Sequence, residues 1–208
     1  MDCLINNAIA GVLDYGQVMD CLKNYKAPHR KITTMLAKGE LIRVKKGLYV
    51  LGEHYRTEPI CRELLANLIF GPSYISQEFA LSFYGMIPER VELVTSMTTK
   101  RNKQFTTPVG NFQYTYINTS RYTVGIDWLA VRKNFHILIA SPEKALIDTI
   151  SRYRDVTTQA DMLDLLFEDL RIDESMLSHL DHDRCQKIAK NYRHPTVTLL
   201  VTTLQELS

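Results

Sequence analysis

Apolar residues recur at helical spacing in three short segments at the start of the chain. Residues 2–13 carry apolar side chains three, four and seven positions apart, which predicts an amphipathic helix. A second helix begins at Asp14 or Tyr15. A third runs from Pro28 to Lys38, because proline suits the first helical position, where its missing N–H costs nothing.

The pattern then changes from helical spacing to alternation. Gly39 predicts the end of the third helix, since glycine tolerates the left-handed conformation found there. Residues 41–45 alternate as a half-buried strand does, Lys46-Gly47 makes a tight turn, and residues 48–51 return as a second strand. A short basic helix followed by a basic hairpin is typical of the recognition helix and wing of a winged helix-turn-helix. We therefore expect such a DNA-binding domain, with three helices and a two-stranded wing, over residues 1–56.

Residues 57–208 have a different sequence pattern, which predicts a small sheet with flanking helices. A helix opens at Glu58-Pro59, and Ser76 is the expected N-cap of the next one. Segments rich in β-branched and aromatic residues predict the strands Val91–Met97, Asn111–Asn118 and Phe135–Ala140, with Arg121–Ile126 as a candidate fourth. The basic run Lys100–Lys103 joins the first two, and we expect an exposed hairpin tip there.

The last third of the chain is predicted to be mainly helical. Ser141-Pro142-Glu143 is a strong helix start, and Lys144, Asp148 and Arg152 then form an i, i+4 ladder worth a few tenths of a kcal/mol per pair. This ladder gives Asp148 a structural rather than a catalytic explanation. A further helix starts at Gln159, whereas residues 196–207 mix helical and β-branched signals and are left unassigned. The fold class is α+β: a winged helix-turn-helix followed by a mixed α/β domain with a helical C-terminal part.

Charge is distributed unevenly between the two predicted domains. Residues 1–56 hold nine Lys and Arg against five Asp and Glu, whereas the remainder has a net charge of −2. Between Asp161 and Asp183 there are eight acids and one arginine, a stretch that DNA would repel. It faces either solvent or a basic partner.

Motifs for catalysis or for cofactor binding are missing from the sequence. Neither phosphate-binding glycine motif occurs, the serines lie outside any G-x-S-x-G elbow, and the H-x-x-H at His179 and His182 has no third ligand. We expect no enzyme, no cofactor and no metal. The cysteines at 3, 21, 61 and 185 form no C-x-x-C pair, so we expect reduced thiols, with Cys61 and Cys185 in the core. With no membrane span or signal sequence, a cytoplasmic protein is expected.

The candidate DNA-binding residues divide into two roles. Arg30, Thr33 and Thr34 are central on the outer face of the third helix and are the candidates for base contact. Lys31, Lys38, Arg43, Lys45 and Lys46 are expected to meet phosphates, and His29 suits either role. The alternative is that these lysines only keep a surface helix soluble.

Three blocks of sequence resemble a known family in the same order. MLAKGELIRVKKGLYVL is similar to the hairpin of AbiEi-type antitoxins, which follows a Gly-Glu/Lys-Leu-x-Arg-Val-x-x-Gly-Leu/Val-Tyr pattern. Residues 74–88 and 140–148 resemble two stretches of that family's second domain, so the likeness spans roughly residues 10–155. No motif of the family can be matched after Arg154.

The resemblance implies a bacterial type IV toxin–antitoxin component. Such a protein binds double-stranded DNA at inverted repeats in its own promoter, represses transcription, and counteracts a nucleotidyltransferase-like toxin. Whether it contacts the toxin directly is left open. Paired half-sites are the only reason to consider a homodimer on DNA. The alternative function is a regulator that uses the winged domain and the acidic α/β domain to bind a protein partner instead of DNA.

Overall fold

The computed structural model describes residues 1–132 and 135–207, and the chain divides into two units of mixed α/β structure. The first comprises Met1–Leu65 together with the short segment Thr106–Gly110. The second comprises Ala66–Phe105 and Asn111–Ser208. No helix of the described residues is both long and apolar enough to cross a membrane.

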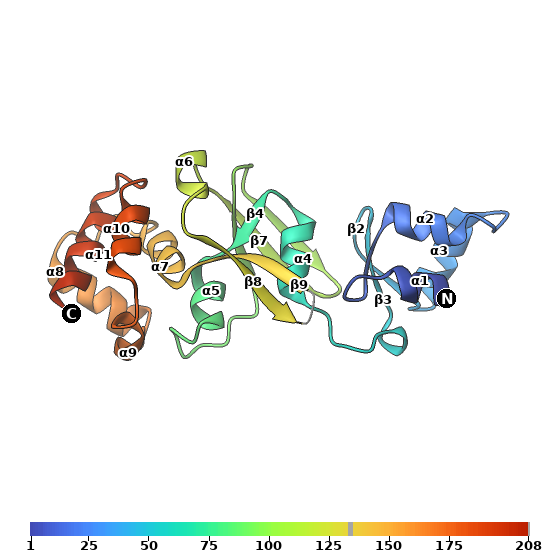
Figure 1. Ribbon diagram of the computed structural model, residues 1–208, viewed down its shortest axis with the longest axis horizontal. Helices are drawn as coiled ribbons and strands as arrows, with labels where there is room; N and C mark the ends of the chain where they lie inside the picture. Colours follow the sequence, from blue (N-terminus) through green and yellow to red (C-terminus); the bar gives the residue numbers. More distant parts are fainter. Residues whose placement is uncertain (133–134, 208) are drawn as a thin grey trace. The chain divides into compact units, whose positions relative to one another are not determined.

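The first unit places helices against a small antiparallel sheet of three strands, in the order β1-β3-β2 (Figure 1). Its helices are α1 (Asp2–Asn7), α2 (Tyr15–Leu22) and α3 (Pro28–Ala37), followed by a 3-10 turn at Glu53–Tyr55. Its strands are β1 (Val12–Asp14), β2 (Leu41–Lys45) and β3 (Leu48–Leu51).

Local sequence explains where α2 and α3 begin and end. The Asp14 side chain accepts a hydrogen bond from Gln17 N, and the Gln17 side chain accepts one from Asp14 N, each 2.8 Å long, so a capping box starts α2. Pro28 occupies the first turn of α3 as predicted. Gly39 follows with φ of +68°, and Glu40 N donates to Met35 O, which closes the helix and turns the chain into β2.

The core of the first unit draws on all three helices and the sheet. Helix α3 contributes Ile32 and Met35, which pack with Leu4 of α1 and with Val18 and Leu22 of α2. These side chains are nearly inaccessible to solvent, so the opposite face of α3 is the one left for contact with other molecules.

The predicted helix over residues 2–13 is wrong in its second half. The helix ends at Asn7, and Ala10 and Gly11 both adopt positive φ, of +51° and +73°. The chain then enters β1, whose Val12 pairs with Val50. The predicted wing hairpin is therefore part of a three-stranded sheet. The sequence pattern did not reveal β1, because apolar residues four apart suit a short helix and a following strand equally well.

The expectation that all cysteines are reduced is also wrong. Cys3 and Cys21 form a disulfide across 18 residues, with their Cα atoms 5.6 Å apart. The packing of α1 on α2 brings the two positions together, and the spacing of the cysteines alone does not reveal this packing. Cys61 and Cys185 are not joined in a disulfide and are buried, as expected of small core residues.

A six-stranded mixed sheet forms the centre of the second unit, in the order β6-β7-β5-β4-β9-β8. The pairs β4–β9 and β5–β7 are parallel, whereas β4–β5 and β8–β9 are antiparallel. The strands are β4 (Ser73–Ile75), β5 (Val94–Thr98), β6 (Lys103–Thr107), β7 (Gly110–Tyr116), β8 (Ile126–Arg132) and β9 (Phe135–Ala140).

Helices accompany this sheet, and one of them is completely enclosed. All residues of α7 from Glu143 to Ile150 are buried, because α7 packs on α5 and β9 and also on α10 and α11. The helices are α4 (Arg62–Ile69), α5 (Gln77–Phe83), α6 (Thr119–Tyr122), α7 (Pro142–Ile150), α8 (Gln159–Asp164) with a π turn at Leu165–Asp169, α9 (Glu174–Leu177), α10 (His182–Ala189) and α11 (Pro195–Glu206).

The sequence-based sheet is right in part. Strand β9 matches its predicted bounds and two others overlap theirs, but β4 and β6 were not predicted, and residues 119–122 form α6 where the fourth strand was expected to begin. Lys100–Lys103 is not a hairpin tip, since β7 lies between β5 and β6. The unassigned C-terminal segment is α11, and the helix expected from Glu58 begins at Arg62.

Candidate nucleic-acid interface

An open groove of about 620 Å³ lies between α3 and the β2–β3 hairpin. His29 and Thr33 line it from α3, and Arg43 and Lys46 line it from the hairpin. Gly47, with φ of +85°, allows the tight turn that carries Lys46 to this edge. Four of the nine candidate DNA-binding residues therefore meet at one groove, although they come from two separate elements.

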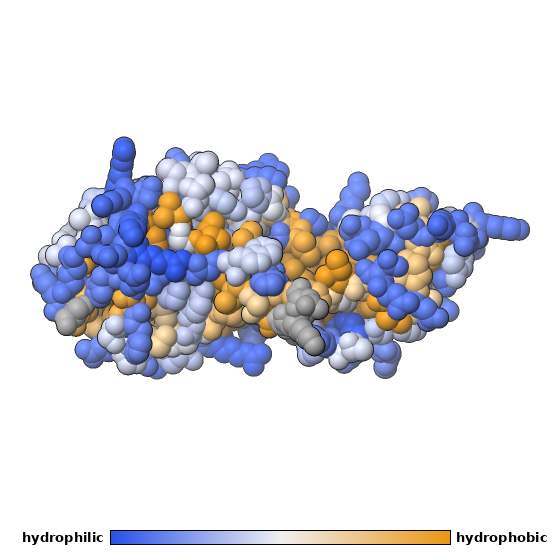
Figure 2. Space-filling model, in the orientation of Figure 1, coloured by the Kyte–Doolittle hydropathy of each residue, from blue (hydrophilic) through white to orange (hydrophobic). Residues whose placement is uncertain are grey.

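The hairpin side of this groove is cationic and open to solvent, and Arg30 is exposed on α3 outside the groove lining. Arg30, Arg43 and Lys46 are exposed, and within residues 1–132 and 135–207 no carboxylate forms an ion pair with any of them. Figure 2 shows hydrophilic side chains projecting over α2 and α3. Cations held without a protein anion leave their full charge available to an external one.

The two threonines of α3 are exposed but have one hydrogen-bond direction already in use. Thr33 Oγ1 donates to His29 O at 3.1 Å, and Thr34 Oγ1 donates to Arg30 O at 3.0 Å. Their hydroxyl oxygens can still accept, and their methyl groups are free. This chemistry suits an amino donor or a thymine methyl group on a base edge.

The other five candidates do not line the groove: Arg30, Lys31, Thr34, Lys38 and Lys45. The Lys31 ammonium lies 5.6 Å from the centroid of the Tyr25 ring, within a different pocket that it shares with Cys21. Lys38 is the exposed C-cap residue of α3. Lys45 is half-buried next to a register shift in the β2–β3 pairing, so it is less available than the exposed Lys46.

Two aromatic residues of the groove were missed by the sequence reasoning. Tyr15 and Tyr49 both line it, and the Tyr15 ring stacks on that of His29 with centroids 6.3 Å apart and planes at 17°. Tyr15 holds the His29 ring beside the groove. No local pattern in the sequence marks either residue, because their place at the groove depends on how α2 and β3 pack beside α3.

Comparison with known proteins adds no assignment. A scan against protein-family models and a search of curated proteins found no match.

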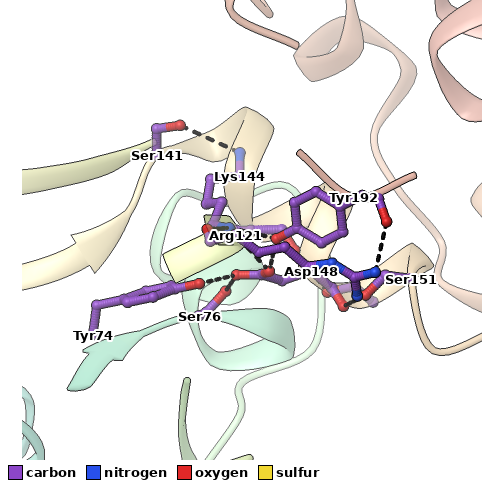
Figure 3. Close-up of polar contacts among 10 residues, drawn as sticks. Tyr74, Ser76, Arg121, Ser141, Lys144, Asp148, Ser151 and Tyr192 are labelled. Carbon is purple, nitrogen blue, oxygen red and sulfur yellow. Dashed lines mark hydrogen bonds and ion pairs between the residues drawn. The ribbon is translucent and has the colours of Figure 1, made fainter. Parts of the chain in front are cut away.

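A second candidate site is a polar cluster buried in the second unit (Figure 3). Asp148 Oδ2 accepts hydrogen bonds from Tyr74 Oη at 2.9 Å and from Ser76 Oγ at 2.7 Å. Asp148 Oδ1 accepts from Tyr192 Oη and lies 3.4 Å from Lys144 Nζ, which also donates to Tyr192 Oη. The cluster joins strand β4, helix α7 and the connection between α10 and α11.

Burial governs the electrostatics of this cluster. It lowers the pKa of the Lys144 ammonium, an effect that the nearby Asp148 carboxylate opposes. It raises the pKa values of Tyr74 and Tyr192, and the same carboxylate adds to both shifts. The side chains of Lys144 and Asp148 are 0% exposed, so a substrate cannot reach them without unfolding of the surrounding helices. The cluster is suited to holding elements together.

Two expectations about this region need correction. Ser76 stands at the N-cap of α5 but makes no side-chain cap bond, because its hydroxyl donates to Asp148 instead. The ladder along α7 is also incomplete: Lys144 pairs with Asp148 in the core, whereas Arg152 pairs with Glu78 of α5. The estimate of a few tenths of a kcal/mol applies to an exposed pair and not to this buried one.

The two histidines of the H-x-x-H motif do not share a helix. His179 follows α9 and its Nδ1 contacts Ser175 O at 2.6 Å, whereas His182 is the first residue of α10. In the described part of the chain, no three His, Cys, Asp or Glu side chains gather as metal ligands do.

Proposed function

We propose that the chain is a DNA-binding transcriptional repressor whose first unit acts as a winged helix-turn-helix. The observation that carries this proposal is the open groove between α3 and the hairpin, with the exposed cations Arg43 and Lys46 on its hairpin side and Arg30 exposed on α3. None of the three has an ion-pair partner among the described residues. A helix of this size enters the major groove, which is about 12 Å wide, while a β-hairpin contacts the adjoining backbone.

The geometry supports a division of roles among the exposed residues. Arg30, Thr33 and Thr34 face outward on α3 and would read base edges. Arg43 and Lys46 on the hairpin would neutralise phosphates, which fixes the register of the protein on the duplex. Lys31 and Lys45 have smaller roles because both are half-buried.

We further propose that this repressor is the antitoxin of a type IV toxin–antitoxin system. The support is the ordered resemblance of three sequence blocks to AbiEi-type antitoxins, whose second domain counteracts a nucleotidyltransferase-like toxin. Under this proposal the protein works in the cytoplasm, where its operator lies, and the second unit supplies the antitoxic activity.

A fluorescence anisotropy titration tests DNA binding. The probe is a duplex from upstream of the protein's own gene, and the variant is Arg30→Ala/Arg43→Ala. We expect its affinity to fall at least about tenfold, since each contact to a base or phosphate contributes about 1 kcal/mol or more. The control is Lys187→Ala/Lys190→Ala on α10, which removes the same charge and should bind within about twofold of the unmodified protein.

Equal affinity of the two double variants would contradict the proposal.

The antitoxic role has a separate test, in which the neighbouring gene is expressed with and without the chain. If the neighbouring gene encodes a nucleotidyltransferase-like toxin, and the Arg30→Ala/Arg43→Ala variant still relieves its toxicity, the antitoxic role is supported. Relief by a variant with weakened DNA binding would also mean that the two roles belong to different units. Toxicity that the unmodified chain does not relieve would contradict the antitoxin assignment alone.

One observation favours the alternative function, binding to a basic protein partner. All eight acidic residues between Asp161 and Asp183 are exposed. Three of them, Asp161, Asp173 and Asp181, already serve as helix caps or in a capping box, so much of this charge has a structural use. Co-purification of a basic protein, together with no DNA binding at low salt, would favour this alternative.

A further inference from the structure

The disulfide of the first unit joins the two helices on which α3 rests. Cys3 belongs to α1 and Cys21 to α2, and both line a pocket together with Lys31 and Met35 of α3. Leu4, the neighbour of Cys3, is in the same apolar core as Ile32 of α3. The position of α1 is therefore coupled to the support beneath the proposed recognition helix.

Few other interactions hold α1 in place. It has six residues, of which only Leu4 is buried, and an isolated helix of this length is unstable in water. Besides the disulfide, Gln17 Nε2 donates to Asn7 O at 3.2 Å, and the Asn7 amide lies against both cysteine sulfurs. Opening the disulfide would free α1 and expose the core around Leu4.

Of the four cysteines, the two that form this disulfide are the more accessible to solvent. Cys3 is exposed and Cys21 half-buried, whereas Cys61 and Cys185 are 3% and 1% exposed. Burial also raises the pKa of the Cys185 thiol to about 12, which removes its reactive thiolate at neutral pH. A soluble thiol reagent therefore selects the Cys3–Cys21 pair.

We propose that Cys3 and Cys21 form a thiol–disulfide exchange site, with a low-molecular-weight disulfide as oxidant and the matching thiol as reductant, that controls how firmly α3 is supported. The inference rests on the proposed function in one respect: a protein that binds its promoter works where thiols are kept reduced, and disulfides there are usually transient. The accessible thiol–disulfide chemistry itself does not depend on DNA.

The exchange is balanced in two steps. The thiolate of the exposed Cys3 attacks one sulfur of the small disulfide, forms a mixed disulfide and releases one small thiolate. The thiolate of Cys21 then attacks Cys3 Sγ, closes the protein disulfide and releases the second small thiolate. The two protons lost by the cysteines are taken up by the leaving thiolates, and the two electrons pass to the small disulfide, which is reduced to two thiols.

The test uses the full chain in glutathione buffers, either fully oxidised or fully reduced. Native alkylation with iodoacetamide should label neither Cys3 nor Cys21 in the oxidised buffer and both in the reduced one. Hydrogen exchange of α1–α3 should be on the order of a hundredfold faster after reduction, as expected when an 18-residue crosslink is lost from a small unit. Affinity for the operator should fall in proportion to the folded fraction of the first unit.

Two variants serve as controls. Cys3→Ser/Cys21→Ser should show the same exchange rates in both buffers, and Cys61→Ser should respond as the unmodified chain does. Labelling of Cys3 and Cys21 in the oxidised buffer, or equal exchange rates of α1–α3 in the two buffers, would overturn the inference. Alkylation and hydrogen exchange need no DNA. A chain that fails to bind the operator would therefore contradict the proposed function, whereas these two measurements would still decide whether Cys3 and Cys21 form the exchange site.

Discussion

The two units use basic side chains in opposite ways. In the first unit Arg30, Arg43 and Lys46 point into solvent with no ion-pair partner among the described residues. In the second unit Lys144 has no exposed surface and contacts Asp148, Tyr192 and the carbonyl of Arg121, the last at 2.6 Å. A cation that the protein satisfies internally holds the fold together, and one that it leaves unsatisfied is available to bind.

This contrast distinguishes a structural cluster from the proposed binding site. Chemically, the buried cluster resembles an active site, since it contains a carboxylate beside a lysine with a lowered pKa and two tyrosines with raised pKa values. Its hydrogen bonds are nevertheless made within the protein, and the Lys144 and Asp148 side chains are 0% exposed. The described residues that line the groove of the first unit form no such network of buried polar side chains, but the groove is open to solvent. Accessibility therefore decides the assignment.

The largest expected effect is alkaline unfolding of the second unit. Burial raises the pKa of Tyr84 to about 12 and raises those of Tyr74, Tyr114 and Tyr192 as well. A group whose pKa is raised by folding stabilises the folded state below its unfolded pKa, near 10, and loses that contribution as pH rises toward the folded value. At about pH 11 the four tyrosines together should cost about 5 kcal/mol of unfolding free energy.

Urea unfolding between about pH 9 and pH 11, followed by tyrosinate absorbance, measures this loss. Lys144 acts in the opposite direction, because its pKa is lowered by folding, but it is one group against four. Tyrosinate absorbance from all four rings before the unfolding transition would contradict the prediction, since it would mean that the rings ionise in the folded state.

The next effect concerns the buried ion pair. Asp148→Ala should lower the unfolding free energy by about 3 to 5 kcal/mol, because it leaves the Lys144 ammonium buried without its carboxylate. Urea denaturation is the measurement. The matched double variant Lys144→Met/Asp148→Leu should lose less than the single one, and a larger loss in the double variant would show that charge burial is not the cause.

A smaller effect is expected at the hydroxyl that was predicted to cap α5. Ser76→Ala should lower the unfolding free energy by about 2 kcal/mol, because Asp148 Oδ2 then loses one of two hydrogen bonds in the core. Ser141→Ala, which removes the side-chain cap of α7, should cost about 1 kcal/mol. If Ser76→Ala cost clearly less than Ser141→Ala, the bond to Asp148 would have little value.

The smallest expected effect distinguishes a cation outside the groove from one that lines it, both in the first unit. Lys31→Ala should change operator affinity by no more than about twofold, because its ammonium lies over the Tyr25 ring and outside the groove. Arg43→Ala, measured in the same titration, should weaken binding several-fold more. Equal losses would mean that the groove does not define the contact surface.

Local signals predicted more of the first unit than of the second. Helix α3, Gly39 and the hairpin are specified by neighbouring residues, and the structure has them at the predicted places. The buried cluster joins Tyr74, Lys144 and Tyr192, which are far apart in sequence, so no local pattern could reveal it. The disulfide was missed for the same reason, since it depends on how α1 packs against α2.

The salt dependence of operator binding tests the central claim most directly. Each neutralised phosphate contributes about 0.9 to the slope of log affinity against log salt concentration. We predict that Arg43→Ala/Lys46→Ala reduces this slope by about two units, whereas Lys187→Ala/Lys190→Ala leaves it unchanged. Parallel slopes for the hairpin variant and the unmodified chain would contradict the assignment of the exposed cations to the DNA backbone.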